Sequence, residues 1–179
     1  MTLLADGKTT FVIQGTFFVS GHPEAKLSTV LGSCISVCLH DAGTLLGGMN
    51  HFLLAAGRGE DAGHIRFGVN AMEKLINEML KAGASRHRLQ AKLFGGARMS
   101  ANLSDIGSAN ASFAEAFLQD EGIPVLSKSI GGNSARRLVF TPATGHAKML
   151  FVPIDSLEPA EVPQRRPVAA PQESTIDLF

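Results

Sequence analysis

Short runs of β-branched and aromatic residues, separated by glycine-containing turns, follow one another along most of the chain. Residues 9–20 are rich in Thr, Val, Ile and Phe, and we expect one or two strands there with a break at Gly15. Residues 21–32, which contain His22-Pro23, are interpreted as a loop. The same kind of pattern predicts further strands over residues 33–40, 45–54, 89–94, 125–130, 136–141 and 147–152.

Two other segments place their apolar residues at the helical period. The first covers residues 69–82 and ends before Gly83. The second covers residues 108–121, where an apolar stripe runs beside a polar flank, and ends before Gly122. Two helices among many strands, with hairpins at both ends, predict an α+β domain of layered, mixed or mainly antiparallel sheet.

Composition and charge narrow the classes of protein to consider. The chain has 179 residues, which is typical of one domain, and 45% of them are hydrophobic. Sixteen Lys and Arg balance sixteen Asp and Glu, which argues against a nucleic-acid binder or a polybasic membrane anchor. No apolar run approaches the ~20 residues of a membrane span, and residues 1–10 lack the pattern of a signal peptide. We therefore expect a cytoplasmic protein without membrane insertion.

The composition changes near Pro153, and the folded domain is predicted to cover residues 9–153. Residues 154–179 contain four prolines, which neither continue a helix nor donate to a sheet, and this segment is interpreted as a flexible tail. Its apolar end, residues 174–179, has two open interpretations. It is either an inert terminus or a docking peptide held near the domain by the tail.

The most informative pair of residues is a cysteine and a histidine on a predicted hairpin. If Ala42-Gly43 is a two-residue loop, Cys34 lies directly opposite His51, with their Cβ atoms about 4.5–5.5 Å apart. An imidazole at that distance would accept the thiol proton and lower the pKa of the cysteine, as nucleophilic catalysis requires. Gly32 and Ser33 precede the cysteine, where a flexible backbone can turn N–H groups toward an oxyanion. A buried structural cysteine is the competing interpretation.

A metal site made of Cys34, Cys38, His40 and His51 is disfavoured. On one strand the two cysteines, which are the only ones in the chain, would lie about 13 Å apart. That distance is too long for a shared zinc ion or for a disulfide. Cys38 is therefore interpreted as a core residue. The double glycines in residues 92–98 and 130–133 match no phosphate-binding motif, and we expect them to let backbone segments pass closely around a site.

Five motifs occur in order along the chain: residues 31–34 (LGSC), residues 49–54 (MNHFLL), residues 92–97 (KLFGGA), Ile106-Gly107 with Asn110, and Gly131-Gly132-Asn133 with Arg136. Together they resemble the CheD family, the chemoreceptor glutamine deamidases of bacterial chemotaxis, over nearly all of residues 9–153. The resemblance implies a cysteine hydrolase without a cofactor that converts receptor glutamines to glutamates. It also implies a fold similar to the catalytic domain of cytotoxic necrotizing factor, and binding to the CheC phosphatase where that protein exists. Some members are credited with receptor methylesterase activity.

The family's site residues carry over to this sequence as expectations. The resemblance makes Cys34 the nucleophile and His51 the general base, with Thr29 as the third residue and Ser28 as a neighbour that could supply the same hydroxyl. The receptor glutamine lies on a long helix bundle, so the site should be a shallow groove. The sequence departs from the family pattern at Ala55, Ser129 and Ala135, where members often have Pro, Asp and Gly.

Two other functions stay open at this point. The chain could be a non-catalytic module that docks on receptors or on a signalling phosphatase, with the cysteine and histidine as packing residues. It could also be a thiol protease or esterase. Conversion of a receptor glutamine, measured as a gain of about 1 Da with release of ammonia, would separate deamidation from docking alone, and peptide-bond cleavage would indicate the protease.

Overall fold

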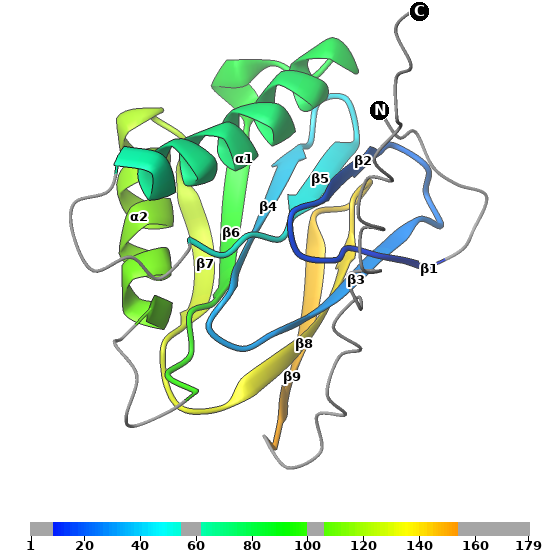
Figure 1. Ribbon diagram of the computed structural model, residues 1–179. Coiled ribbons are helices and arrows are strands. Elements are labelled where there is room, and N and C mark those ends of the chain that lie inside the picture. The colour runs from blue at the N-terminus through cyan, green and yellow to red at the C-terminus, as the bar shows by residue number, and fades with distance from the viewer. Residues whose placement is uncertain (1–8, 55–61, 100–105, 154–179) are drawn as a thin grey trace, which may run out of the picture.

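A computed structural model describes residues 9–54, 62–99 and 106–153 of the chain (Figure 1). Its elements are short strands with two long helices, one after β5 and one after β6. In chain order they are β1 (Thr9–Phe11), β2 (Phe17–Ser20), β3 (Lys26–Leu31), β4 (Ile35–Asp41), β5 (Leu46–Asn50), α1 (Ala62–Lys81), the 3₁₀ turn η1 (Arg86–Arg88), β6 (Gln90–Gly95), α2 (Ile106–Asp120), β7 (Val125–Ile130), β8 (Ala135–Thr141) and β9 (His146–Val152).

The strands form two mixed sheets. The four-stranded sheet has the order β1-β3-β8-β9, and the five-stranded sheet has the order β2-β5-β4-β6-β7. The pairs β1–β3 and β6–β7 are parallel, and the other pairs are antiparallel. Both helices pack on the five-stranded sheet, on the side away from the four-stranded sheet (Figure 1). The predicted α+β class, with layered sheets and two main helices, is confirmed, whereas the likeness to cytotoxic necrotizing factor stays an expectation.

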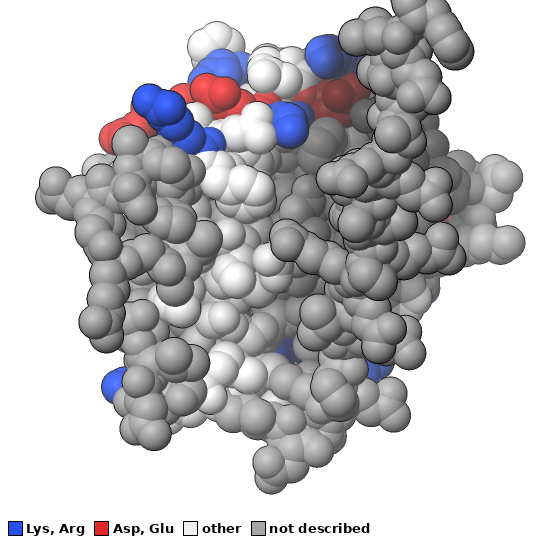
Figure 2. All heavy atoms as spheres, in the orientation of Figure 1, with Lys and Arg blue, Asp and Glu red and all other residues white. Residues whose placement is uncertain are grey.

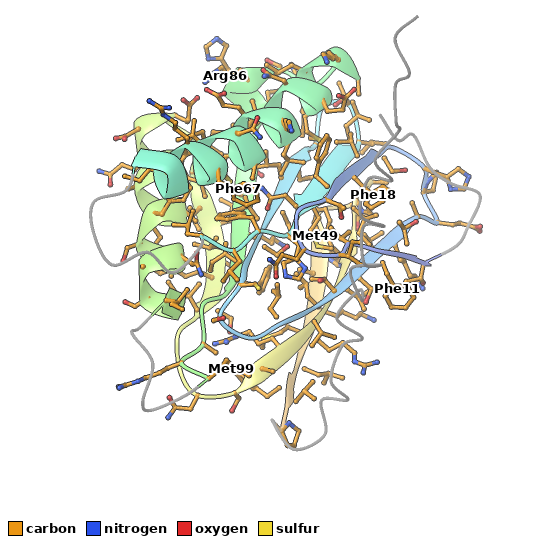
Figure 3. All side chains as sticks on the ribbon, in the orientation of Figure 1. Phe11, Phe18, Met49, Phe67, Arg86 and Met99 are labelled. Atoms are coloured by element: carbon orange, nitrogen blue, oxygen red, sulfur yellow. The ribbon has the colours of Figure 1, made fainter. Side chains whose placement is uncertain are left out.

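Each interface between layers has its own apolar core. Because strand side chains alternate between the two faces, Ile35, Val37 and Leu39 of β4 face the helices. Cys38, on the opposite face of β4, is 1% exposed and packs between the sheets with Met49 and Phe140. Met49 is labelled in Figure 3, where it lies between the two sheets. The interpretation of Cys38 as a core residue is therefore confirmed.

The surface over α1 is the charged part of the face shown in Figure 2. Lys, Arg, Asp and Glu gather along this upper edge, and the described surface beneath them is mostly uncharged. Among the described residues, neither helix combines the length and the apolar character needed to cross a bilayer.

Two predicted boundaries are wrong. The expected loop over residues 21–32 contains β3, which its polar residues disguise: Ser28 and Thr29 are both buried inside the sheet layers. The first helix starts at Ala62 and not at residue 69. Ile65 and Phe67 in its first turns are exposed, so the apolar residues there do not fall on the buried face and the helical period is lost.

The predicted register of the β4–β5 hairpin is also wrong, by two residues. Cys38 pairs with Met49 and Asp41 pairs with Leu46, so the loop contains four residues and not two. A two-residue loop of the common type I′ would require positive φ at Ala42 as well as at the following glycine. In the longer loop the left-handed conformation falls on Leu45, at φ 54°, and the Gly43 N–H donates to Asp41 Oδ1 at 2.9 Å.

Asp41 ties this hairpin to η1. Its buried carboxylate accepts hydrogen bonds from Arg88 Nε at 2.8 Å, Arg88 Nη2 at 2.9 Å and the Ser85 N–H at 2.8 Å. The Arg88 guanidinium, with help from the backbone N–H groups, holds the pKa of Asp41 well below its usual range. A lowered pKa stabilises the fold above the unfolded-state value of about 3.9, and this stabilisation is lost as the pH falls below it.

We expect Asp41→Asn to lower the free energy of unfolding by about 2 kcal/mol at pH 7, because it removes charge-assisted hydrogen bonds from a buried group. The difference from wild type should shrink as the pH falls below about 4. Urea unfolding at both pH values measures it. Asp120→Asn, at the exposed end of α2, is the control and should change stability by less than about 0.5 kcal/mol. An equal loss in both variants would contradict this assignment.

Candidate active site

The side chain of His51 lies between the two sheets, at the point where the chain leaves β5. Its Nδ1 is 2.9 Å from Thr29 Oγ1 on β3 and 3.1 Å from the carbonyl oxygen of Val12. The Thr29 hydroxyl is itself 2.8 Å from the same Val12 carbonyl. Thr29, expected from the resemblance alone to be the third site residue, is therefore in direct contact with the predicted base.

These contacts define the tautomer of His51. The Val12 carbonyl can only accept, so the Thr29 hydroxyl donates its single proton to that oxygen. Nδ1 of His51 must then carry a proton, which it donates to the Thr29 oxygen and the Val12 carbonyl. In a neutral imidazole this leaves the lone pair on Nε2. That atom is buried and has no hydrogen-bond partner among the described residues.

The backbone of His51 is held by the turn between β1 and β2. The His51 N–H donates to the Thr16 carbonyl at 3.0 Å, and the His51 carbonyl accepts from the Gly15 N–H at 2.7 Å. On the other side, the neighbouring Asn50 accepts the Val37 N–H through Oδ1 at 2.9 Å, and its carbonyl accepts the Ser36 hydroxyl at 2.6 Å. These side-chain bonds bridge a gap in the β4–β5 ladder.

The ladder resumes beyond that gap, where Ile35 and Phe52 exchange two backbone hydrogen bonds of 2.9 Å. Cys34 precedes Ile35 and His51 precedes Phe52, so the two side chains project to the same face of the sheet as diagonal neighbours. Diagonal positions lie about 7–8 Å apart along the backbone. At rest no hydrogen bond joins the two groups, because the Cys34 thiol donates to Gln14 and Nε2 of His51 has no partner among the described residues. The prediction of directly opposed residues is wrong, but the shared face survives because a slip of two residues preserves it.

Glycines let two backbone segments pass close to Cys34. A Cβ on Gly95 would lie 2.1 Å from the Cys34 carbonyl oxygen, and Gly95 has a φ of +112° that other residues rarely adopt. The Cys34 carbonyl accepts the Gly96 N–H at 2.8 Å. A Cβ on Gly32 would meet Met99 at 3.0 Å, and the Gly32 carbonyl accepts the Ala97 N–H at 2.9 Å. The expected close passage of the double glycine is confirmed for residues 95–96.

Asn110 on α2 joins the segment before Cys34 to the segment after His51. Its Nδ2 donates to the Ser33 carbonyl at 2.9 Å, and its Oδ1 accepts the Leu54 N–H at 2.7 Å. Asn110 is fully buried. Asn110 belongs to one of the five sequence motifs, but its role in joining these two segments is visible only in the structure.

Arg136 holds the second double glycine, Gly131-Gly132, in place. This buried guanidinium donates through Nη2 to the Gly131 carbonyl at 2.7 Å and through Nε to Ser129 Oγ at 3.1 Å. The Gly131 N–H in turn donates to the Gly95 carbonyl at 3.0 Å. Ser129 thus acts as an acceptor where the family often has Asp. Ala135 is a buried β8 residue, and Ala55 lies outside the described residues.

Comparisons with known proteins match the sequence of this chain to one family. The family model "CheD chemotactic sensory transduction" matches residues 54–150. A relative from Caulobacter sp. (strain K31), named "Probable chemoreceptor glutamine deamidase CheD", is 52% identical over 93% of this chain and 89% of its own length. The chain belongs to the CheD family. A second relative, "Probable chemoreceptor glutamine deamidase CheD 1" of Ruegeria sp. (strain TM1040), is 54% identical over 82% of this chain and 79% of its own.

Among solved structures, the hypothetical protein YfiH of Bacillus licheniformis is similar in part to this CheD family member. The sequences are 15% identical, and the match covers 63% of this chain and 49% of that chain with a TM-score of 0.44. Within the described ranges, no group of three or more His, Cys, Asp and Glu side chains is placed to hold a metal ion.

The resting state of the cysteine in this CheD family protein differs from the predicted ion pair. Burial raises the pKa of the Cys34 thiol to about 11, and the cysteine's own backbone N–H offsets this only in part. Burial also lowers the pKa of His51. Both groups are therefore neutral at pH 7, with the proton on sulfur, and the predicted lowering of the cysteine pKa is wrong. At pH 7 only a very small fraction of Cys34 is thiolate, so the reactive thiolate must form during the reaction.

Because Cys34 and His51 are both neutral at rest, the rate of cysteine alkylation should depend strongly on pH. We expect iodoacetamide to label Cys34 faster than Cys38, since Cys38 is fully buried and its pKa is raised further. Labelling of Cys34 should accelerate about tenfold per pH unit between pH 7 and pH 10, below its pKa. Mass spectrometry of the two cysteine peptides measures both rates. A rate that is already at its plateau at pH 7 would mean that an ion pair exists at rest.

Proposed function

We propose that this protein is a chemoreceptor glutamine deamidase in which Cys34 is the nucleophile and His51 is the general base. The observation that carries the proposal is the buried Nε2 of His51, an acceptor without a hydrogen-bond partner among the described residues. Leaving such an atom unpaired is unfavourable for the fold, so it indicates chemistry. The names of the relatives supply the substrate class.

In the proposed reaction, Nε2 of His51 takes the thiol proton as Cys34 Sγ attacks the side-chain carbonyl carbon of a receptor glutamine. The tetrahedral adduct collapses when the imidazolium gives that proton to the amide nitrogen. Ammonia leaves, and a thioester to Cys34 remains. Water then loses a proton to Nε2 and attacks the thioester, which yields glutamate and restores the thiol. The balance of atoms needs only water, and we propose no cofactor.

The remaining site residues support these steps. Thr29 is proposed as a positioning residue, because it keeps the proton on Nδ1 of His51 and the lone pair on Nε2. Gly32 and Ser33 are proposed to shape the loop before the nucleophile, where Asn110 holds the Ser33 carbonyl. The Cys34 backbone N–H lies against its own thiol, a suitable place for one oxyanion donor.

Other parts of the proposal concern organisation and partners. The catalytic domain is proposed to cover residues 9–153 of a cytoplasmic protein, with chemoreceptors as substrates and a CheC-type phosphatase as a further partner.

Phe11 and Ile13 beside the site are 71% and 66% exposed, and Phe11 extends outward from β1 in Figure 3. These side chains are suited to contact a receptor helix. The predicted tail, residues 154–179, lies outside the described residues.

The test is incubation of the protein with a receptor cytoplasmic fragment, followed by intact-mass measurement and an ammonia assay. We expect a gain of about 1 Da and one ammonia for each glutamine converted. A loss of about 14 Da from a methylated fragment would instead indicate methylesterase activity. Cleaved fragments would indicate a protease, and tight binding without a mass change would indicate a docking module.

A further inference from the structure

A glutamine of the protein itself lies against the proposed nucleophile. The Cys34 thiol donates to Oε1 of Gln14, with 3.6 Å between the sulfur and the oxygen. Gln14 belongs to the segment between β1 and β2 and is exposed. Among the described residues, the thiol is the only hydrogen-bond partner of its carboxamide. The side chain therefore has no evident role in holding the fold together.

The segment that carries Gln14 is well anchored. The Thr16 N–H and the Thr16 hydroxyl both donate to the Ile13 carbonyl, at 3.0 and 2.7 Å, which closes a turn over residues 13–16. Gly15 has a φ of +85°, the conformation that a type II turn requires at its third residue, so Gln14 occupies the second position. The Gly15 N–H donates to the His51 carbonyl at 2.7 Å. One rigid turn thus positions Gln14 relative to both His51 and Cys34.

A carboxamide at this place can serve the reaction through its NH₂ group. When the thiol proton moves to His51, Oε1 of Gln14 loses its donor, and rotation of the amide by half a turn presents the NH₂ group. The oxyanion forms on the carbon that has just bonded to Sγ, so it lies next to the sulfur that Gln14 already contacts. An oxyanion donor must lie about 2.7–3.1 Å from that oxygen, which the flexible end of Gln14 can reach.

We propose that Gln14 is a catalytic residue whose amide NH₂ group donates a hydrogen bond to the oxyanion, beside the Cys34 backbone N–H. This inference rests on the proposed function, because it concerns the tetrahedral adduct of Cys34. Removing one oxyanion donor lowers kcat by about 100- to 1,000-fold in other hydrolases. A loss of that size, without a change in the reactivity of the thiol itself, distinguishes an oxyanion donor from a residue that only supports the loop.

The experiment compares two reactions of Cys34 in the full-length protein. Acylation by p-nitrophenyl acetate passes through an oxyanion, whereas alkylation by iodoacetamide does not. For Gln14→Met, which keeps the length of the side chain and loses the NH₂ group, we expect acylation to slow about 100-fold and alkylation to stay within about twofold of wild type. Gln119→Glu, on the exposed side of α2, is the control and should change neither rate. On receptor fragments, Gln14→Met should lower kcat with KM within about threefold.

Three results would overturn the role of Gln14. Equal slowing of both reactions would mean that Gln14 only supports the site. Unchanged acylation would mean that it makes no catalytic contact. Conversion of Gln14 to Glu in the wild-type protein but not in Cys34→Ala, seen by peptide mass, would make it a substrate of the thiol. The two-reaction comparison needs no receptor, so a wild-type protein that acylates as expected but leaves receptor glutamines intact would contradict only the proposed function.

Discussion

Replacing Cys34 with alanine is expected to abolish deamidation of receptor fragments, with a fall in kcat of at least about 10,000-fold. The proposed reaction has no second nucleophile, because the thioester forms on this sulfur alone. Cys34 is only half-buried, so loss of the sulfur should change the free energy of unfolding by less than about 1 kcal/mol. Ammonia release at saturating substrate and urea unfolding measure the two effects.

Cys38→Ala is the matched control for that experiment. Cys38 is buried between the sheets with Met49 and Phe140, so its truncation leaves a small cavity and should lower the free energy of unfolding by about 1–2 kcal/mol. Turnover should remain near the wild-type value. Retained activity in Cys34→Ala, or a folded but inactive Cys38→Ala, would mean that the nucleophile has been assigned to the wrong residue.

His51→Ala is expected to lower kcat by about 10,000-fold as well, since the thiol has a raised pKa and depends on Nε2 to remove its proton. Burial lowers the pKa of His51, so the imidazole of the wild-type protein stays neutral at pH 6.5. The wild-type rate should therefore fall only as the pH drops below about 6.5, where the imidazole becomes protonated. Measurement of kcat/KM between pH 5 and pH 8 checks this acid limb.

Two further variants make the histidine experiment decisive. His51→Gln fills more of the buried volume than alanine does and should be equally inactive, which separates loss of the base from loss of the fold. His87→Ala, on the exposed 3₁₀ turn, is the control and should keep full activity. Activity of either His51 variant within tenfold of wild type would contradict the role of His51 as base.

The sequence pattern predicted elements wherever burial followed the local period. The strands 125–130 and 136–141 agree with β7 and β8, and the face shared by Cys34 and His51 is correct. The β3 strand was missed because its interior positions include Ser28 and Thr29. Their hydroxyls donate to the Leu138 carbonyl on β8 and to the Val12 carbonyl directly after β1, the two strands that flank β3 in the same sheet. No local pattern reports such distant partners.

Local sequence patterns also miss contacts within the site, because those contacts join residues that are far apart in the chain. Thr29 was expected only through the family resemblance, since its contact with His51 spans 22 positions of the chain. Gln14 was missed because the sequence marks only the glycine that follows it, and its contact with Cys34 depends on how β1 and β2 are anchored to His51. The predicted lowering of the cysteine pKa was wrong because it counted the neighbouring imidazole and left out the burial of both groups.

The most direct test of the central claim is to trap the acyl-enzyme. A receptor fragment and the wild-type protein are mixed and quenched in acid at short times, and the covalent complex is located by peptide mass spectrometry. We predict a transient thioester between the receptor glutamine side chain and Cys34, with a mass about 17 Da below the sum of the two peptides because ammonia has left. Turnover without any adduct on Cys34, or with an adduct on Cys38, would contradict the account.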